Sequence, residues 1–227
     1  MVRVSVVVPT LNEARALPAL LKQLQAWQQP GDEILVVDGG SNDGTAALAQ
    51  ESCANVLRVN AGRSNQLNAG GHHARGDVIW FVHADSDIKH VSRTDIVSAI
   101  ESGTQWGWCT VAIDDPALWF RVIERGMRWR SKLTRVATGD QGMFMTRALF
   151  DRVGGFPELE LMEDVAISKR LRQVARPTLV TQRLVTSSRR WREAGVLKTI
   201  GLMWFLRLMF FIGVNPTTLA RWYRFRT

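Results

Sequence analysis

Residues 78–87 read VIWFVHADSD, five apolar residues followed at once by a polar cluster. The apolar run at 78–82 predicts a strand buried on both faces of a sheet. Two similar runs precede it, at 4–8 and 33–37, and segments with helical spacing lie between them. Strands that alternate with helices predict βαβ units, and therefore an α/β fold with a mainly parallel, Rossmann-like sheet.

The remaining elements complete one domain. Further strands are predicted at 56–59, 108–113 and 142–146, and helices at 17–27, 45–52, 64–74, 116–135, 163–175 and 196–214. No repeat or linker divides the chain. We therefore expect a single domain over 1–227, made of a first half at 1–105, a second at 106–191 and a helical appendage at 192–227.

The composition narrows the class of partner and compartment. The net charge is 29 − 21 = +8 and the sequence pI is about 10.4, so we expect an anionic partner. Cys53 and Cys109 form no CxxC pair, which argues against a disulfide framework or a zinc site. The N-terminus reads as a strand and lacks the regions of a signal peptide, so a cytoplasmic location is expected.

The apolar segment at 196–214 raises the question of a membrane. It is about 19 residues long, near the minimum for a bilayer span, but Lys198 and Arg207 interrupt it. A helix that docks on the domain or lies in the membrane interface is favoured over a spanning one. With the basic, tryptophan-bearing helix at 116–135, it predicts peripheral contact with the inner face of the membrane, in preference to nucleic acid.

Two carboxylates follow the strand at 78–82. In an extended segment, residues i and i+2 point the same way, so Asp85 and Asp87 would address one site, with Ser86 between them. Mg²⁺ and Mn²⁺ prefer oxygen ligands and often share substrate phosphates. The triplet predicts such a cation, held jointly with a diphosphate; a solvated acidic turn is the alternative.

Polar residues also follow the strand at 33–37. Asp38 opens a glycine-rich turn that allows close backbone approach, and it can accept from a base N–H or a ribose hydroxyl. The alternative is a turn in which Asp43 or Thr45 caps the next helix. Both interpretations can hold together.

Two further segments are placed to meet a nucleotide. The first joins the first strand to a helix N-terminus and contains Pro9, Thr10, Asn12 and Glu13, with helix capping by Asn12 as the alternative. The second opens the helix that carries Asn68. There Arg63 could reach a phosphate or a base, or be an ordinary surface charge.

The second half supplies a candidate base and a basic-aromatic cluster. Glu163 and Asp164 open a helix, where acidic residues commonly complement the dipole. The dipole would keep Asp164 ionised, so that it could remove a proton from an acceptor hydroxyl. Arg190 and Trp191 could contact a diphosphate or the acceptor; an interfacial anchor or a solvated basic face is the alternative.

The order of these motifs resembles that of family 2 glycosyltransferases. The resemblance covers roughly residues 3 to 191, and the matching strings are VVVPTLNE (6–13), VVDGGSNDGT (36–45), DSD (85–87), GGF (154–156), MED (162–164) and RW (190–191). Within the family the chain is similar to small bacterial transferases that carry an arsenosugar-biosynthesis label. The signs of this group are GR (62–63), QLNAG (66–70), HAD (83–85), GDQG (139–142) and TSSRRW (186–191).

The resemblance implies a GT-A fold and an inverting, single-displacement sugar transfer. The donor would be a nucleoside-diphosphate sugar of the UDP type, and the acceptor an unidentified small molecule or a lipid-linked one. Asp164 and Glu163 would be the catalytic residues, with Asp164 as the base, and Asp87 would bind the metal. Donor contacts would come from Pro9, Thr10, Asn12, Glu13, Asp38, Arg63, Asn68, Asp85, Ser86, Arg190 and Trp191.

One departure and two rival functions limit this prediction. Ser187 stands where processive members have the Gln of Gln-x-x-Arg-Trp, which argues against a polymerising synthase. A nucleotidyltransferase on the same fold would release pyrophosphate from a nucleoside triphosphate. A basic, non-enzymatic membrane- or nucleic-acid-binding module would explain the charge but not the ordered acidic strand ends.

Overall fold

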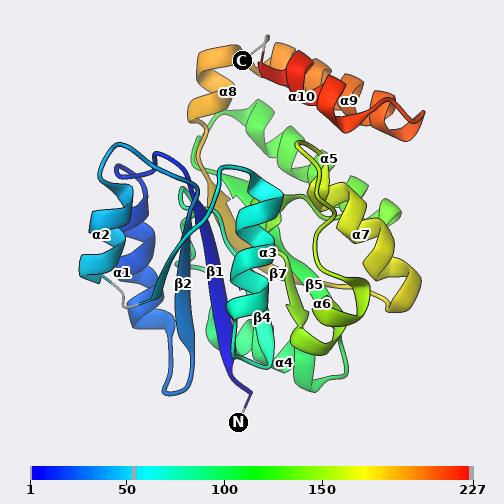
Figure 1. Cartoon of the computed structure of the whole chain (residues 1–227). Coiled ribbons are helices and arrows are strands. Elements are labelled where there is room, and N and C mark those ends of the chain that lie inside the picture. Colours follow the sequence, from blue (N-terminus) through cyan, green and yellow to red (C-terminus); the bar gives the residue numbers. More distant parts are fainter. Residues whose placement is uncertain (1, 53–54, 225–227) are drawn as a thin grey trace.

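The computed structural model of the chain describes residues 2–52 and 55–224, without the side chains of residues 190, 193 and 224. Its described part contains one seven-stranded sheet, in the order β3-β2-β1-β4-β6-β5-β7 (Figure 1). All strand pairs are parallel except those of β6, which runs antiparallel to β4 and β5. The strands are β1 (Val4–Thr10), β2 (Glu33–Asp38), β3 (Asn55–Arg58), β4 (Val78–Phe81), β5 (Trp106–Ile113), β6 (Phe144–Thr146) and β7 (Thr178–Thr186).

The predicted α/β fold is confirmed, and most of the predicted elements are present within a few residues. The helices are α1 (Leu17–Trp27), α2 (Thr45–Ser52), α3 (Arg63–His73), α4 (Arg93–Glu101), α5 (Leu118–Thr134), α6 (Arg147–Val153), α7 (Glu163–Val174), α8 (Arg189–Ala194), α9 (Val196–Phe211) and α10 (Pro216–Arg224). A short 3₁₀ turn, η1 (Gly139–Gln141), precedes β6. The elements that the sequence analysis missed are β7, α4, α6, α8 and α10.

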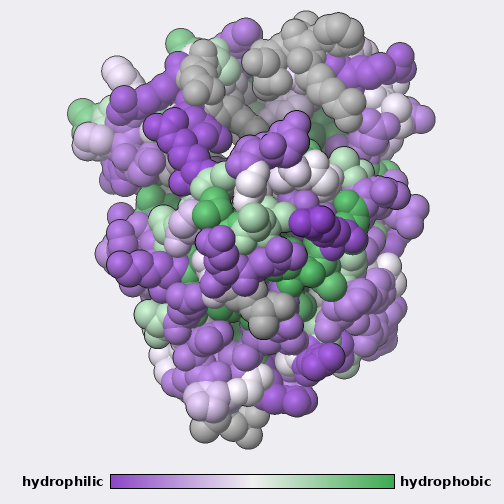
Figure 2. Space-filling view, turned by 60° about the vertical axis from the view of Figure 1, so that its left-hand side comes forward, coloured by the Kyte–Doolittle hydropathy of each residue, from purple (hydrophilic) through white to green (hydrophobic). Residues whose placement is uncertain are grey.

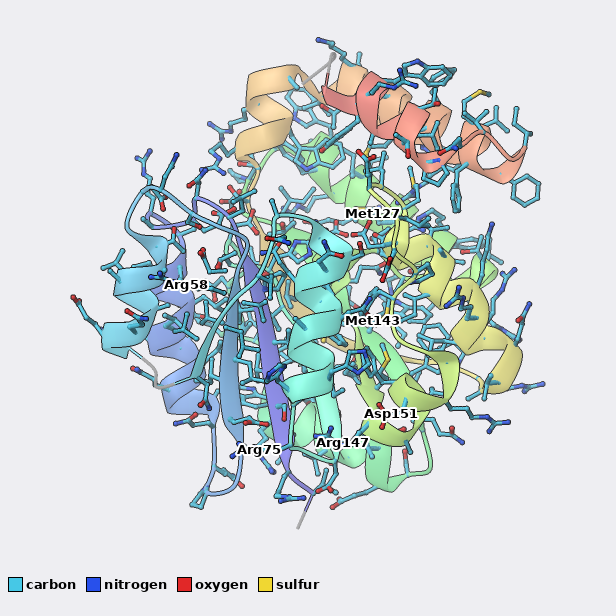
Figure 3. All side chains as sticks on the ribbon, in the orientation of Figure 1. Arg58, Arg75, Met127, Met143, Arg147 and Asp151 are labelled. Carbon is cyan, nitrogen blue, oxygen red and sulfur yellow. The ribbon has the colours of Figure 1, made fainter. Side chains whose placement is uncertain are left out.

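Two apolar cores lie on opposite faces of the sheet. On one face, side chains of α1, α2 and α4 pack on alternate residues of β1 and β4, with Trp80 fully buried. On the other face, α3, α6 and α7 cover the strands, and Figure 3 shows Met143 among the side chains between α3 and α7. Gly70 lets α3 approach β1 closely, because a Cβ there would lie 2.3 Å from a methyl of Val7.

A third, smaller core lies under the C-terminal helices. Leu202 and Leu206 of α9 and Leu219 of α10 pack on Val136, Met162 and Val165. These helices lie across the top of the molecule in Figure 1, on the side of the carboxyl ends of the parallel strands. No helix within the described ranges has both the length and the apolar character needed to cross a bilayer.

Candidate functional site

Two loops at the upper edge of the sheet are tied to each other. Asn12 adopts a left-handed backbone conformation (φ 56°), and its Oδ1 accepts from the Asn42 N–H at 3.0 Å. Asp43 accepts from the N–H of Thr45 at 3.0 Å, so the prediction that it caps α2 is confirmed. The capping alternative for Asn12 is wrong, because α1 begins only at Leu17. The Glu13 N–H donates to the Thr45 hydroxyl, so the loop after β1 and the loop after β2 form one hydrogen-bonded unit.

The ends of β1 and β2 are hydrogen-bonded to a residue of α3 that the sequence analysis did not select. The buried Gln66 of α3 donates to the carbonyls of Thr10 (2.7 Å) and Val37 (2.9 Å). Thr10 is itself buried, and the preceding Pro9 is half-buried in β1. Gln66 thus fixes the two strand ends beside which a donor would lie.

Asp38 is buried at the end of β2 and organises its own turn. Its carboxylate accepts from the N–H groups of Gly40 and Ser41, each at 3.1 Å, and from the Ser41 hydroxyl. The glycine-rich turn therefore folds back on Asp38. A ligand at this carboxylate would meet a side chain that is already held in place.

Asn68, predicted to contact the donor, is hydrogen-bonded to the backbone of Phe156 in the folded chain. Its Nδ2 donates to the Phe156 carbonyl at 2.8 Å, and its Oδ1 accepts from the Phe156 N–H at 2.7 Å. The amide thus pairs with one backbone residue in the manner of a strand neighbour. It fastens the segment of Gly154, Gly155 and Phe156 to α3.

The segment after β4 is a turn, which corrects the premise of an extended chain. The Ser86 N–H donates to the His83 carbonyl at 3.1 Å, so Asp85 lies within a turn. Asp87 exchanges two backbone hydrogen bonds with Val185 of β7. That Asp85 and Asp87 share a site therefore no longer follows from alternation along a strand.

The potential metal ligands after β4 fit a cation that is bound jointly with a substrate, because they are too few to enclose a cation by themselves. No group of three or more metal-ligating side chains occurs within the described ranges. Ser86 is buried, and its Oγ has no hydrogen-bond partner among the described residues. Asp87 pairs with the exposed ammonium of Lys89 at 2.9 Å. Partial burial opposes ionisation of Asp87, but the bonds from Lys89 outweigh it and lower its pKa.

An arginine connects the N-termini of α3 and α7. Arg63 Nε lies 2.9 Å from Glu163 Oε1, and an Arg63 Nη2 also contacts the His83 ring. Glu163 is buried; burial first, and then the charge of Asp164, raise its pKa, while Arg63 opposes the shift. A Cβ at Gly139 would lie against the Arg63 guanidinium and the His83 ring, so a larger residue there would require these side chains to shift.

Asp164 lies in the first turn of α7 beside this ion pair. Its Oδ2 accepts from the Gly139 N–H at 2.9 Å, and its Oδ1 accepts from the Val165 N–H at 2.7 Å. Asp164 is half-buried and lines a cavity of about 10 Å³ together with Arg63, His83 and Glu163. A larger open hollow of about 340 Å³ lies at the opposite edge of the sheet, at the starts of β5 and β7.

The basic-aromatic cluster lies on α8, just beyond the end of β7. Trp191 is half-buried and packs edge-on against Phe120 of α5, with 6.5 Å between the ring centroids. The Arg190 side chain lies outside the described residues. The neighbouring Arg192 forms an ion pair with Asp115 at 2.6 Å, which fixes α8 at the upper edge.

Comparison with known proteins assigns the class. Residues 5–153 match the family model described as "Glycosyl transferase family 2". The fold is that of the GT-A glycosyltransferases. The chain belongs to glycosyl transferase family 2.

Individual relatives agree with this assignment. An undecaprenyl-phosphate 4-deoxy-4-formamido-L-arabinose transferase of Enterobacter sp. (strain 638) is 31% identical over 148 residues, 60% of this chain and 44% of the relative. The chain spans less than half the length of such curated relatives. Among solved structures, S. aureus TarS 1–349 with UDP has a TM-score of 0.64 at 19% identity, covering 82% of this chain and 60% of that one. A mannosyltransferase from Pyrobaculum calidifontis with GDP-Man and Mn²⁺ also gives 0.64, at 23% identity, covering 87% and 62%.

The family assignment decides between the functions that the sequence left open. Membership in this family favours glycosyl transfer over the nucleotidyltransferase and non-enzymatic alternatives. The sequence analysis did not select Gln66, Gly139 or His83 as site residues. Three strings that it quoted for the resemblance, QLNAG, HAD and GDQG, contain Gln66, His83 and Gly139, so that signal was available.

Proposed function

We propose that the chain transfers a sugar, with inversion, from a nucleoside-diphosphate sugar to an acceptor bound between α3, α7 and the C-terminal helices. The observation that supports this most strongly is the ion pair between Arg63 and Glu163. It joins the half of the molecule with the polar strand ends to the helix that presents Asp164. Donor and acceptor groups would therefore meet beside one carboxylate.

Asp164 is proposed as the general base. Its carboxylate is held by two backbone N–H groups, so it is fixed in orientation before a substrate binds. It would take the proton of an acceptor hydroxyl as that oxygen attacks the anomeric carbon. The bond from that carbon to the diphosphate breaks, and the nucleoside diphosphate leaves on the opposite side. Glu163 positions Arg63, whose guanidinium faces the same cavity.

A divalent cation is proposed to be held by Asp87, with the help of Asp85 and of the Ser86 hydroxyl, which has no hydrogen-bond partner among the described residues. When bound, Mg²⁺ or Mn²⁺ supplies charge that stabilises the departing diphosphate. Lys89 neutralises Asp87 in this structure, so cation binding would have to displace an exposed ammonium.

The donor is proposed to be a UDP-sugar. The uridine would bind beside Asp38 at the end of β2 and beside Thr10 and Glu13, at and just after the end of β1. The bound ligands in the structures of relatives include both UDP and GDP-Man. A thermal-shift panel of UDP, GDP and their sugars, with and without Mn²⁺, separates these, because a ligand of the folded state raises its stability. A Mn²⁺-dependent shift with GDP alone would reject the UDP proposal.

Transfer itself is tested with radiolabelled nucleotide sugars and a lipid extract as acceptor. Asp164→Asn should reduce the rate at least about 100-fold, in keeping with loss of a general base. Asp151→Asn, an exposed carboxylate of α6 (Figure 3), is the matched control and should retain the wild-type rate. Equal rates for the two variants would reject Asp164 as the base.

A peripheral membrane contact is proposed for α5 and α9, at the top of the molecule in Figure 1. Exposed apolar side chains line α5, where Trp119 and Trp129 are 63% and 68% exposed, and Arg125 and Arg128 lie between them. An apolar face flanked by cations suits an anionic bilayer. The face in Figure 2, by contrast, is largely hydrophilic, with hydrophobic residues gathered across its middle. A lipid-linked acceptor would suit this location.

Co-sedimentation with vesicles tests the contact. We expect binding to vesicles of phosphatidylcholine and phosphatidylglycerol at low salt, and weaker binding for Trp119→Ser combined with Trp129→Ser. Val174→Ser alters an apolar side chain of α7 that is 37% exposed and should bind as the wild type does. Absence of wild-type binding at low salt would exclude the contact.

A further inference from the structure

Two arginines, one on α5 and one on α9, have buried nitrogen atoms without a hydrogen-bond partner among the described residues. The Nε atoms of Arg130, on α5, and of Arg207, on α9, have no hydrogen-bond partner in the described part of the chain. Both residues are only half-exposed. A buried N–H without an acceptor is costly, and more so on a charged group. The two guanidinium groups therefore need a further partner.

The surroundings of Arg130 do not supply that partner. Its Nη1 donates to the Val136 carbonyl at 3.3 Å and its Nη2 to Gln141 Oε1 at 3.5 Å, both long bonds. Burial first, and then the charge of Arg207, lower the pKa of Arg130 to about 10, while Asp140 and Asp164 oppose the shift. Neither carboxylate forms an ion pair with it among the described residues. Val136, whose carbonyl accepts from Arg130, belongs to the same core as Leu206 beside Arg207, so both arginines border this core.

Arg207 lies on α9, a helix that also carries exposed apolar side chains. The adjacent Leu206 is fully buried in the core that also contains Met162. On the same helix, Trp204, Leu208 and Phe211 are 62%, 56% and 78% exposed. A ligand with an anionic head at Arg207 and an apolar chain would find partners for both parts along one helix.

We propose that Arg130 and Arg207 bind the phosphate group of an amphiphilic acceptor, a phosphate monoester on an apolar chain, next to Asp164. Guanidinium groups bind phosphate by charge-assisted, often bidentate hydrogen bonds. The site rests on the proposed glycosyl transfer for its role, but its ligand binding is measurable without turnover. It assigns a function to the arginine that interrupts the apolar segment.

The test is isothermal titration of the protein with decyl phosphate, with decanol and inorganic phosphate as partial ligands. We expect decyl phosphate to bind more tightly than either partial ligand. Arg130→Gln combined with Arg207→Gln should weaken its binding at least about 10-fold, the effect of losing one charge-assisted bond. The control, Arg125→Gln combined with Arg128→Gln, removes the same charge from the exposed side of α5 and should change binding less than about twofold.

The single variant Arg207→Gln guards against a folding defect, since the buried Nε of Arg207 has no hydrogen-bond partner in the described part that its loss would leave unpaired. It should retain the wild-type melting temperature and still weaken decyl phosphate binding. Equal affinity of the wild type, Arg207→Gln and both double variants would overturn the proposal, as would no wild-type binding of decyl phosphate.

Two further measurements separate the alternatives. Vesicles of phosphatidylcholine and phosphatidylglycerol should bind the Arg130/Arg207 variant as they bind the wild type, whereas the Arg125/Arg128 variant, which lacks two cations of the proposed membrane contact, should bind them more weakly. If the Arg130/Arg207 variant lost vesicle binding while keeping its affinity for decyl phosphate, the site would serve bilayer headgroups and the proposal would be wrong. Binding of UDP with Mn²⁺ should be the same in all variants; its absence from the wild type would count against the proposed donor, and not against this site.

Discussion

Replacement of Asn68 by alanine distinguishes a structural from a donor-binding role. The substitution removes two hydrogen bonds to Phe156, of 2.8 and 2.7 Å, and leaves that residue's N–H and carbonyl without their partner. A net hydrogen bond is worth about 0.5–1.5 kcal/mol, and an unsatisfied buried group costs about 1–3 kcal/mol. We expect the free energy of unfolding to fall by about 2–3 kcal/mol.

Urea unfolding followed by tryptophan fluorescence measures this loss through the midpoint and slope. Asn65→Ala is the control, because Asn65 is exposed on the same helix, and we expect it to change stability by less than about 0.5 kcal/mol. Asn68→Asp keeps an acceptor for the Phe156 N–H but sets a carboxylate oxygen against its carbonyl, so it should also be destabilised. The reasoning is refuted if Asn68→Ala is as stable as Asn65→Ala while its affinity for UDP with Mn²⁺ falls 10-fold.

Three further predictions concern the metal, pH and packing. Lys89→Met frees Asp87 from an exposed ion pair worth up to about 1 kcal/mol, so half-maximal activation should need up to about fivefold less Mn²⁺; an unchanged requirement would argue against Asp87 as the ligand. The pKa of Glu163 in the folded protein is raised above its ordinary value of 4.5. The stability that protonated Glu163 contributes is therefore complete below about pH 4.5 and is lost as the pH rises through the raised pKa. The wild type should therefore lose stability relative to Glu163→Gln above about pH 4.5, and parallel pH profiles in urea unfolding would contradict this. Gly70→Ala forces a Cβ to within 2.3 Å of Val7 and should cost about 1–3 kcal/mol in thermal unfolding; a neutral effect would mean that α3 is free to shift.

The sequence was sufficient for the elements whose burial is complete. β1, β2 and β4 are continuous apolar runs, buried on both faces, and such runs identify a parallel sheet directly. β7 was missed because its residues vary between buried and exposed, as at the edge of a sheet. Helix α10 was not predicted, although it begins at Pro216 and proline is well accommodated at the first position of a helix.

The site was predicted as a set of positions but not as a set of contacts. The placement of Arg63 and Glu163 at helix starts follows from local pattern, yet their ion pair depends on packing of residues 100 positions apart. The bond between Asn68 and Phe156 spans 88 positions. The turn after β4 depends on a backbone hydrogen bond that side-chain alternation does not encode. The predicted division of the chain at residues 105 and 191 stays a prediction.

The pairing of Asp87 with Val185 of β7 has a consequence for biosynthesis. Chains fold largely as they leave the ribosome, beginning from the N-terminus. The strands β1, β2 and β4 can pair early, but the loop after β4 acquires its hydrogen-bonding partner only when β7 has been made. A nascent chain that stops before β7 should therefore have β1, β2 and β4 paired while the loop that contains Asp87 still lacks its partner strand. The order of synthesis would delay activity until nearly the whole chain has emerged.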